Sequence, residues 1–209
     1  MVTKLPRIPF LCVITDESIS AVSLAEEALR GGAAMIQLRH KTASGMELFA
    51  WAQEIRKLCR KYGALFFVND RLDIAMACGA DGVHLGQEDI PARAARKIAG
   101  GKLLIGISAT SVDEALKAQE EGADYIGLGH IFPTMSKEKH HPPLGVEALA
   151  AAASLLSVPI VAIGGITLEN APVLVAAGAT GIAVISAVSR APSPHEAARD
   201  LAKAINPDS

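Results

Sequence analysis

Aromatic residues and cysteines are scarce in this chain of 209 residues, and no charge of one sign prevails. Only 4% of the residues are aromatic, although half of the chain is hydrophobic. Small and aliphatic side chains must therefore form the core, a composition typical of buried parallel strands covered by Ala-rich helices. The length suits one substantial core better than two full domains. We expect a single domain of class α/β over residues 1–209.

The near absence of net charge narrows the range of partners. Lys and Arg number 20, Asp and Glu number 22, and the net charge is −2. We therefore expect no binding to nucleic acid or to a membrane surface, and any anion site must be local. No apolar run approaches the roughly 18 residues of a membrane span, and the start of the chain lacks the apolar stretch of a secretory signal. These absences indicate a cytoplasmic protein.

The three cysteines, Cys12, Cys59 and Cys78, lack CxxC spacing and the spacing of a metal site. They lie in apolar segments, which favours reduced residues of the core. A redox-active or reactive thiol is the alternative.

Short apolar runs of strand type alternate with helical patterns about eight times along the chain. The expected strands are 10–15, 35–41, 65–70, 82–85, 103–108, 125–131, 159–166 and 181–186. The clearest helical segments are 23–30, 47–61, 113–121, 169–177 and 194–205. Eight units in 209 residues give about 26 residues each, close to one strand, one helix and their loops. This repeat predicts a single TIM (β/α)8 barrel.

A doubly wound open sheet is the alternative fold, because it also alternates strands and helices. In this chain, the turn after the first expected strand reads Thr15-Asp16-Glu17-Ser18. It lacks the GxGxxG motif of a dinucleotide-binding fold. Eight strand–helix units also fit a closed barrel better than they fit a doubly wound sheet of six strands. In such a barrel, polar residues at the carboxyl ends of the strands form the site.

The second expected strand ends in polar residues on one face. Gln37, Arg39 and Lys41 alternate with the apolar Ile36 and Leu38, so the polar set is expected to face the barrel mouth. Two cations and an amide without an acid favour an anion site. An ion pair inside the barrel or a solvated strand end is the alternative.

Acidic residues follow the next two strands. Asn69 and Asp70 end the third strand, and Asp89 follows the fourth. Carboxylates at one rim are suited to an Mg2+ ion shared with substrate phosphates. Helix N-capping is the alternative role for each Asp. The cations Arg39 and Lys41 nearby favour the metal site.

Hydroxyls and glycines follow the last four strands. Ser108 ends the fifth strand, and the long connection after the sixth carries Thr134, Ser136 and Lys137. Gly164-Gly165 ends the seventh strand and Ile185-Ser186 the eighth. In barrels, a phosphate commonly binds between the loops after these last two strands, on bare backbone N–H groups. A polar surface loop is the alternative for the long connection.

Two histidines, His84 and His130, lie at strand ends. Either is a candidate acid or base. A hydrogen-bonded structural histidine is the alternative for both.

Together, these segments resemble the thiamine-phosphate synthase family, also called thiamine-phosphate pyrophosphorylase. The resemblance covers nearly the whole chain. It rests on Val13-Ile14-Thr15-Asp16, Gln37-Leu38-Arg39-His40-Lys41, Phe67-Val68-Asn69-Asp70, Gly82-Val83-His84-Leu85-Gly86-Gln87-Glu88-Asp89, Gly106-Ile107-Ser108, Phe132-Pro133-Thr134-Met135-Ser136-Lys137, Val161-Ala162-Ile163-Gly164-Gly165-Ile166 and Ala183-Val184-Ile185-Ser186.

The resemblance implies a transferase that joins 4-amino-5-hydroxymethyl-2-methylpyrimidine diphosphate to 4-methyl-5-(2-phosphoethyl)thiazole, or to its carboxylated precursor. Pyrophosphate is released and thiamine phosphate forms. The implied contacts are Gln37 with the pyrimidine; Arg39, Lys41, Asn69, Ser108 and Lys137 with the pyrophosphate; Asp70 and Asp89 with Mg2+; and Thr134, Ser136, Gly164, Gly165, Ile185 and Ser186 with the thiazole phosphate. Among these, Arg39, Lys41, Ser108 and Lys137 are expected to be catalytic.

The chain departs from the family pattern at a few positions. His40 replaces a common acid, Thr110 replaces a common His, and Ser136 replaces a common Thr. His130 matters more, because a related thiazole tautomerase uses His at this position for proton transfer. The alternatives are therefore that tautomerase and a non-enzymatic phosphate sensor. The partners expected are the two small phosphorylated substrates, and a homo-oligomer is compatible with the sequence.

Overall fold

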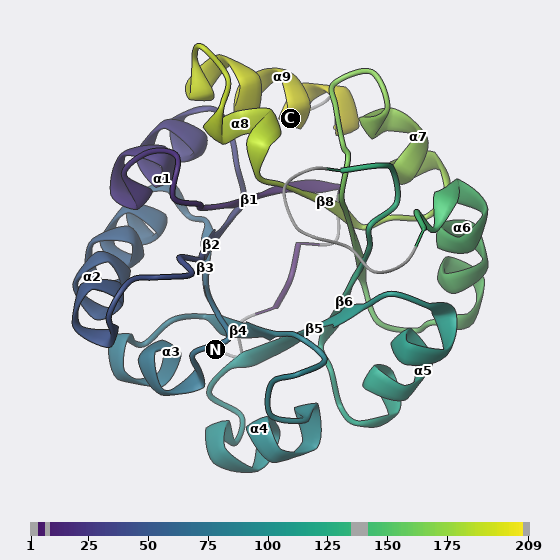
Figure 1. Cartoon of the computed structure of the whole chain (residues 1–209), viewed down its shortest axis with the longest axis horizontal. Coiled ribbons are helices and arrows are strands. Elements are labelled where there is room, and N and C mark those ends of the chain that lie inside the picture. Colours follow the sequence, from purple (N-terminus) through teal and green to yellow (C-terminus); the bar gives the residue numbers. More distant parts are fainter. Residues whose placement is uncertain (1–3, 7–8, 135–141, 207–209) are drawn as a thin grey trace.

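The protein is a closed barrel of eight parallel strands inside a ring of helices, seen along the barrel in Figure 1. The computed structural model describes residues 4–6, 9–134 and 142–206. The strands are β1 Phe10–Ile14, β2 Met35–Leu38, β3 Leu65–Asn69, β4 Gly82–Leu85, β5 Leu104–Ala109, β6 Tyr125–Gly129, β7 Ile160–Ile163 and β8 Gly181–Val184. The helices are α1 Ala21–Arg30, α2 Gly45–Tyr62, α3 Leu72–Cys78, α4 Ala92–Ala99, α5 Val112–Glu120, α6 Gly145–Leu155, α7 Ala171–Ala176, α8 Ser186–Ser189 and α9 Pro194–Ile205.

Each strand pairs in parallel with the next, and β8 pairs with β1 to close the ring. This closure confirms the predicted TIM barrel and excludes the open doubly wound sheet. The period of two in each strand divides its side chains between the barrel interior and the helices. Phe67 and Tyr125 fill the interior and meet edge to face, with ring centroids 5.6 Å apart.

Glycines on neighbouring strands make room for the large interior side chains. A Cβ added to Gly82 would lie 2.2 Å from the Phe67 ring, and one added to Gly106 would lie 2.1 Å from the Tyr125 ring. Because such contacts are far below van der Waals distance, the aromatic rings occupy the places that side chains on β4 and β5 would otherwise take.

The cysteines are part of this packing. Cys12 lies in the barrel interior, Cys59 lies on the buried face of α2, and all three cysteines are free thiols. Burial, with the nearby Asp81 carboxylate, raises the pKa of Cys59 to about 12. Burial likewise raises the pKa of Cys12 and Cys78. These protonated thiols agree with the predicted core role.

Several predicted strands end too late. Strands 35–41, 125–131, 159–166 and 181–186 were expected, but β2 ends at Leu38, β6 at Gly129, β7 at Ile163 and β8 at Val184. The polar residues beyond these points leave the sheet and line its mouth. Within the described ranges, the structure has no helix long and apolar enough to span a membrane.

Candidate active site

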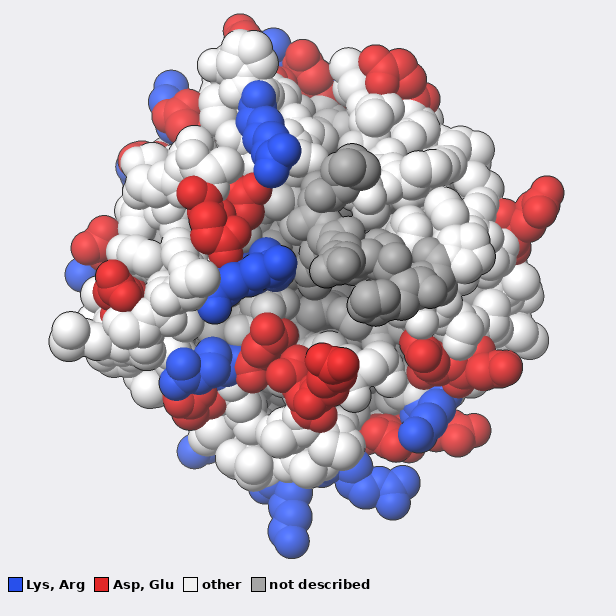
Figure 2. Space-filling view, viewed as in Figure 1, with Lys and Arg blue, Asp and Glu red and all other residues white. Residues whose placement is uncertain are grey.

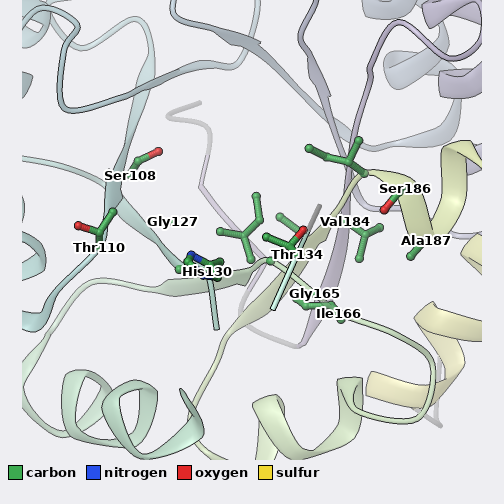
Figure 3. Close-up of a pocket in the computed structure, with 15 residues that line it drawn as sticks. Ser108, Thr110, Gly127, His130, Thr134, Gly165, Ile166, Val184, Ser186 and Ala187 are labelled. Atoms are coloured by element: carbon green, nitrogen blue, oxygen red, sulfur yellow. The ribbon is translucent and has the colours of Figure 1, made fainter. Parts of the chain in front are cut away.

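Two adjoining cavities open at the carboxyl ends of the strands. The first, the Gly164 cavity, has a polar lining of Ser108, Thr110, His130, Thr134, Gly164, Gly165 and Ser186 (Figure 3). The second, the Gln37 cavity, has a polar lining of Gln37, Arg39, Asn69, His84, Ser108 and Tyr125. Ser108, Gly127, Ile163, Ala183 and Ile185 line both. The two cavities therefore share a wall, and Ser108 carries its hydroxyl.

The Gly164 cavity combines residues from four strand ends. Figure 3 shows Ser108 and Thr110 across the cavity from Ser186, with His130 and Thr134 between them. Sequence reasoning singled out most of this lining, and the structure brings those residues together. Thr110 was noted only as a departure from the family pattern, yet it lies in the wall.

The glycine pair after β7 is required by packing. Gly164 has φ +100° and Gly165 has φ +66°, both left-handed conformations that strain other residues. A Cβ on Gly164 would lie 2.3 Å from the Cβ of His130, and one on Gly165 would lie 2.4 Å from the carbonyl oxygen of Pro133. The glycines therefore let the segment after β6 lie against the end of β7.

The Gln37 cavity receives the polar face predicted for the second strand. Gln37 and Arg39 are buried, with 3% and 8% of their surface exposed, and both line the cavity. Lys41 lies beyond the strand and is exposed. The prediction that these side chains share an inward face is therefore correct for Gln37 and Arg39, whereas Lys41 lies at the rim of the barrel mouth.

Thr15 explains why β2 stops before Arg39. Its hydroxyl accepts a hydrogen bond from the Arg39 N–H at 2.9 Å and donates one to the Arg39 carbonyl at 2.9 Å. A side chain thus satisfies both backbone groups that a neighbouring strand would otherwise bond. The Arg39 guanidinium is thereby anchored at its backbone.

Two acids after Thr15 extend this support. The Glu17 carboxylate accepts a hydrogen bond of 2.6 Å from the Lys41 N–H. Burial opposes ionisation of Glu17, but this bond and the nearby Arg39 and His40 lower its pKa. Asp16 accepts hydrogen bonds from Ser18 and, at 3.0 Å, from the Ser189 hydroxyl of α8. The β1–α1 loop therefore touches both the segment after β2 and the helix after β8.

His84 lies between two hydroxyls in the barrel. Its Nδ1 is 2.8 Å from the Tyr125 hydroxyl, and its Nε2 is 2.8 Å from the Ser108 hydroxyl. The side chain of Gln87 donates to the Ser108 carbonyl at 2.5 Å. Sequence reasoning found His84 but missed Tyr125, whose β-strand position gave no signal beyond an apolar pattern.

The carboxylates predicted to hold Mg2+ lie after adjacent strands but line different cavities. Asp70 lines a third cavity, the Lys41 cavity, together with Arg39, Lys41 and Asn69. Asp89 lines a separate cavity and accepts a hydrogen bond of 2.7 Å from the Gly86 N–H. The N-caps of α3 and α4 are Arg71 and Pro91, so neither Asp occupies the N-cap position considered as its alternative.

Two predicted residues, Ser136 and Lys137, lie outside the described residues. Among the described residues, no group of three or more His, Cys, Asp or Glu side chains could hold a metal ion. The face shown in Figure 2 carries basic and acidic side chains together, without a wide area of one sign.

Comparison with known proteins decides the family. The family model described as thiamine monophosphate synthase matches residues 11–188. The chain belongs to this family. It is 58% identical over 197 residues to a thiamine-phosphate synthase of Chlorobium limicola, covering 94% of each chain. It is 59% identical over 201 residues to that of Chlorobium luteolum, covering 96% of this chain and 95% of the relative.

A solved structure supports the same assignment. The thiamine phosphate pyrophosphorylase of Pyrococcus furiosus superimposes with a TM-score of 0.89 at 43% identity, covering 95% of this chain and 96% of that one. The resemblance to the thiamine-phosphate synthase family and the expected transferase class are therefore confirmed.

Proposed function

We propose that this member of the thiamine monophosphate synthase family joins 4-amino-5-hydroxymethyl-2-methylpyrimidine diphosphate to 4-methyl-5-(2-phosphoethyl)thiazole or its carboxylated precursor. The products are thiamine phosphate and pyrophosphate, with CO2 released as well when the carboxylated precursor reacts. The observation that carries the proposal is the shared wall between the Gln37 and Gly164 cavities. Two differently lined cavities that meet can hold two substrates with their reacting atoms adjacent.

In this proposal the Gln37 cavity binds the pyrimidine diphosphate. The buried Gln37 amide can pair with a ring that has both donors and acceptors. Arg39, Asn69 and Ser108 supply a cation and neutral donors for the pyrophosphate. Lys41 at the rim, with Lys137 outside the described residues, would add charge.

The Gly164 cavity would hold the thiazole phosphate. Thr134 and Ser136, the latter outside the described residues, would supply hydroxyls. The backbone of Gly164 and Gly165 and the Ile185-Ser186 turn would form the rest of the anion site. In this cavity the nucleophilic ring nitrogen would face the shared wall.

The chemistry needs no protein nucleophile. The pyrimidine carbon–oxygen bond breaks, its electron pair leaves with the pyrophosphate, and the thiazole nitrogen bonds to the carbon. The aminopyrimidine ring can delocalise the positive charge that develops on its methylene carbon. Arg39, Lys41, Ser108 and Lys137 would stabilise the negative charge on the leaving group, while the cavity walls hold the substrates in line.

Mg2+ is the proposed cofactor, with Asp70 and Asp89 as its ligands. The donor chemistry fits, because Mg2+ prefers one or two carboxylates plus the substrate's phosphate oxygens. Asp70 also lines the same cavity as Arg39 and Lys41, where a diphosphate would meet both charges. The bound ion would supply charge neutralisation for the leaving pyrophosphate.

The proposal also covers the binding partners of the protein and its location in the cell. The partners would be its two small phosphorylated substrates, without nucleic acid or membrane, in the cytoplasm. A homo-oligomer remains compatible with this function.

The thiazole tautomerase is the alternative with a specific observation in its favour, since His130 is 4% exposed and lines the Gly164 cavity. The synthase accounts for more of the site, because a tautomerase has no use for the Gln37 cavity and its buried Arg39. A phosphate sensor would bind a single ligand, so it would have no need for two cavities that share a wall.

A coupling assay separates these functions. Purified protein given both substrates and Mg2+ should form thiamine phosphate and pyrophosphate in equal amounts, and omitting either substrate should stop both. Conversion of the thiazole carboxylate tautomer without metal, abolished by His130→Ala, would establish the tautomerase instead. Phosphate binding without either reaction would establish the sensor.

A further inference from the structure

A line of three polar side chains crosses the barrel from β6 to the shared wall. The Tyr125 hydroxyl on β6 forms a hydrogen bond with His84 on β4, and His84 forms another with the Ser108 hydroxyl on β5. Each hydrogen bond is 2.8 Å long. Tyr125 is 2% exposed and lies in the interior cluster with Phe67 and Cys12. The line therefore runs from the barrel interior along the wall of the Gln37 cavity, which Tyr125 and His84 also line, and ends at the one hydroxyl that both cavities share.

We propose that Tyr125 and His84 are positioning residues that fix the direction of the Ser108 hydroxyl, so that its proton points into the cavity toward an anionic oxygen of the substrate. The proposal rests on the proposed function, in which Ser108 contacts the leaving pyrophosphate. The direction of the hydrogen bonds is a property of the protein alone.

The direction follows from the buried phenol. Burial, with a smaller contribution from Cys12, raises the pKa of Tyr125 well above its usual value, so the hydroxyl keeps its proton. Among the described residues, the hydrogen-bond partner of this hydroxyl is the Nδ1 of His84. A buried O–H group without an acceptor is strongly disfavoured. Tyr125 therefore donates, and Nδ1 accepts.

The rest of the chain of donors is then fixed. A neutral imidazole whose Nδ1 accepts must carry its proton on Nε2. That proton is donated to the Ser108 oxygen 2.8 Å away. The Ser108 oxygen is thus an acceptor for His84, and its own proton is left to point elsewhere. Imidazolium at His84 would deprive the Tyr125 proton of this acceptor.

The barrel is shaped around this line of side chains. A Cβ on Gly106 would lie 2.5 Å from the Tyr125 hydroxyl oxygen, and a Cβ on Gly127 would lie 2.8 Å from the His84 ring. Two glycines on neighbouring strands thus leave space for the two rings. The Ser108 backbone is held separately, because the Gln87 amide donates to its carbonyl.

A fixed direction matters for a leaving anion. A freely rotating serine hydroxyl must be ordered as charge develops, whereas one already oriented stabilises the charge without reorganisation. His84 in this arrangement keeps its proton and transfers none. It acts through Ser108, and so does Tyr125.

The first test reads the tautomer directly. The chain has six histidines, so 15N-labelled histidine NMR can assign His84 by the signal that disappears in His84→Gln. We expect His84 to be neutral with its proton on Nε2 at pH 7.5, and Tyr125→Phe to introduce the Nδ1–H form. A proton on Nδ1 in the unaltered protein would overturn the proposal. This result does not depend on activity.

The second test measures coupling to Ser108. Tyr125→Phe should lower kcat about 3- to 10-fold with a smaller change in KM, the size expected for one weakened hydrogen bond. In a Ser108→Ala background, the same change should lower kcat less than about 2-fold, because the positioned group is gone. Equal losses in both backgrounds would show a merely structural effect and overturn the proposal.

A matched control exists, because Tyr62 is the only other tyrosine and is exposed on α2. Tyr62→Phe should leave kcat and the His84 tautomer unchanged. If the unaltered protein forms no thiamine phosphate, the proposed function fails while the NMR result still decides the direction of the hydrogen bonds.

Discussion

At the scale of single residues, the site depends on side chains that never reach the cavity. Thr15 is the clearest case, since it is fully buried and bonds both backbone groups of Arg39. Its partner lies 24 residues along the chain, so no local pattern could indicate the contact. The sequence predicted Gln37 and Arg39 because the period of two is a local property of a strand.

Replacing Thr15 should therefore damage the anion site indirectly. Thr15→Val keeps the shape but leaves the Arg39 N–H and carbonyl without their partner, which costs about 1–3 kcal/mol of stability. We expect kcat/KM for the pyrimidine diphosphate to fall by about 10-fold. Thr15→Ser keeps the hydroxyl and should retain most of the activity. Steady-state kinetics and urea unfolding measure both effects, and equal kinetics for the two variants would contradict this role.

Gly164 should tolerate no side chain. Gly164→Ala adds about 1–3 kcal/mol of backbone strain and places a Cβ 2.3 Å from that of His130. We expect a loss of stability greater than the strain alone, with a higher KM for the thiazole phosphate. Gly63→Ala is the control, because Gly63 has φ +70° with nothing within 4 Å of an added Cβ. Equal stability losses for both would show that contact with His130 is unimportant.

At the scale of elements, the β1–α1 loop connects the segments that follow β2 and β8, the two strands that flank β1 in the closed barrel. The Asp16 carboxylate accepts a hydrogen bond from the Ser189 hydroxyl of α8, and the Glu17 carboxylate accepts one from the Lys41 backbone N–H. Sequence periodicity predicted the interior of every strand and of α1, α2, α5, α7 and α9, and β4 and α9 agree with prediction at both ends. It failed where strands end, because those ends are set by contacts such as Thr15 with Arg39. It also missed the four-residue helix α8, which is too short to show a period.

The loop should give stability a measurable pH dependence. Burial opposes ionisation of Asp16, but hydrogen bonds from Ser18 and Ser189 and the charge of Arg190 lower its pKa below the usual 3.8. A lowered folded pKa means that ionised Asp16 stabilises the fold above about pH 4 and that this contribution is lost as the pH falls through the folded pKa. Unfolding free energies measured from pH 7 to about 3 should fall more steeply for the unaltered protein than for Asp16→Asn. Parallel curves would contradict this.

At the scale of the whole molecule, one rim brings together three regions of different chemistry. The Gln37 and Gly164 cavities share Ser108, and the Lys41 cavity shares Arg39 and Asn69 with the Gln37 cavity. The closed barrel could be predicted from eight repeats. The shared walls could not, because they depend on which side chains from distant strands meet.

The proposed metal site makes a prediction at this scale. Asp70→Asn removes a charged ligand, so the Mg2+ concentration for half-maximal rate should rise at least about 10-fold. Asp89→Asn should also raise the Mg2+ concentration for half-maximal rate. Its effect on Mg2+ use should be larger than its effect on the stability of the fold. Asp113→Asn, at an exposed acid in the first turn of α5, is the control. Unchanged Mg2+ titrations with lowered stability would indicate structural roles for Asp70 and Asp89.

The central claim, that one rim holds two substrates in two adjoining cavities, is tested most directly by a crystal structure with thiamine phosphate, pyrophosphate and Mg2+. The account predicts the pyrimidine beside Gln37, the pyrophosphate beside Arg39 and Ser108, and the thiazole phosphate beside Gly164 and Ser186. Pyrophosphate bound away from Arg39, or both phosphorylated groups within the Gly164 cavity, would contradict it.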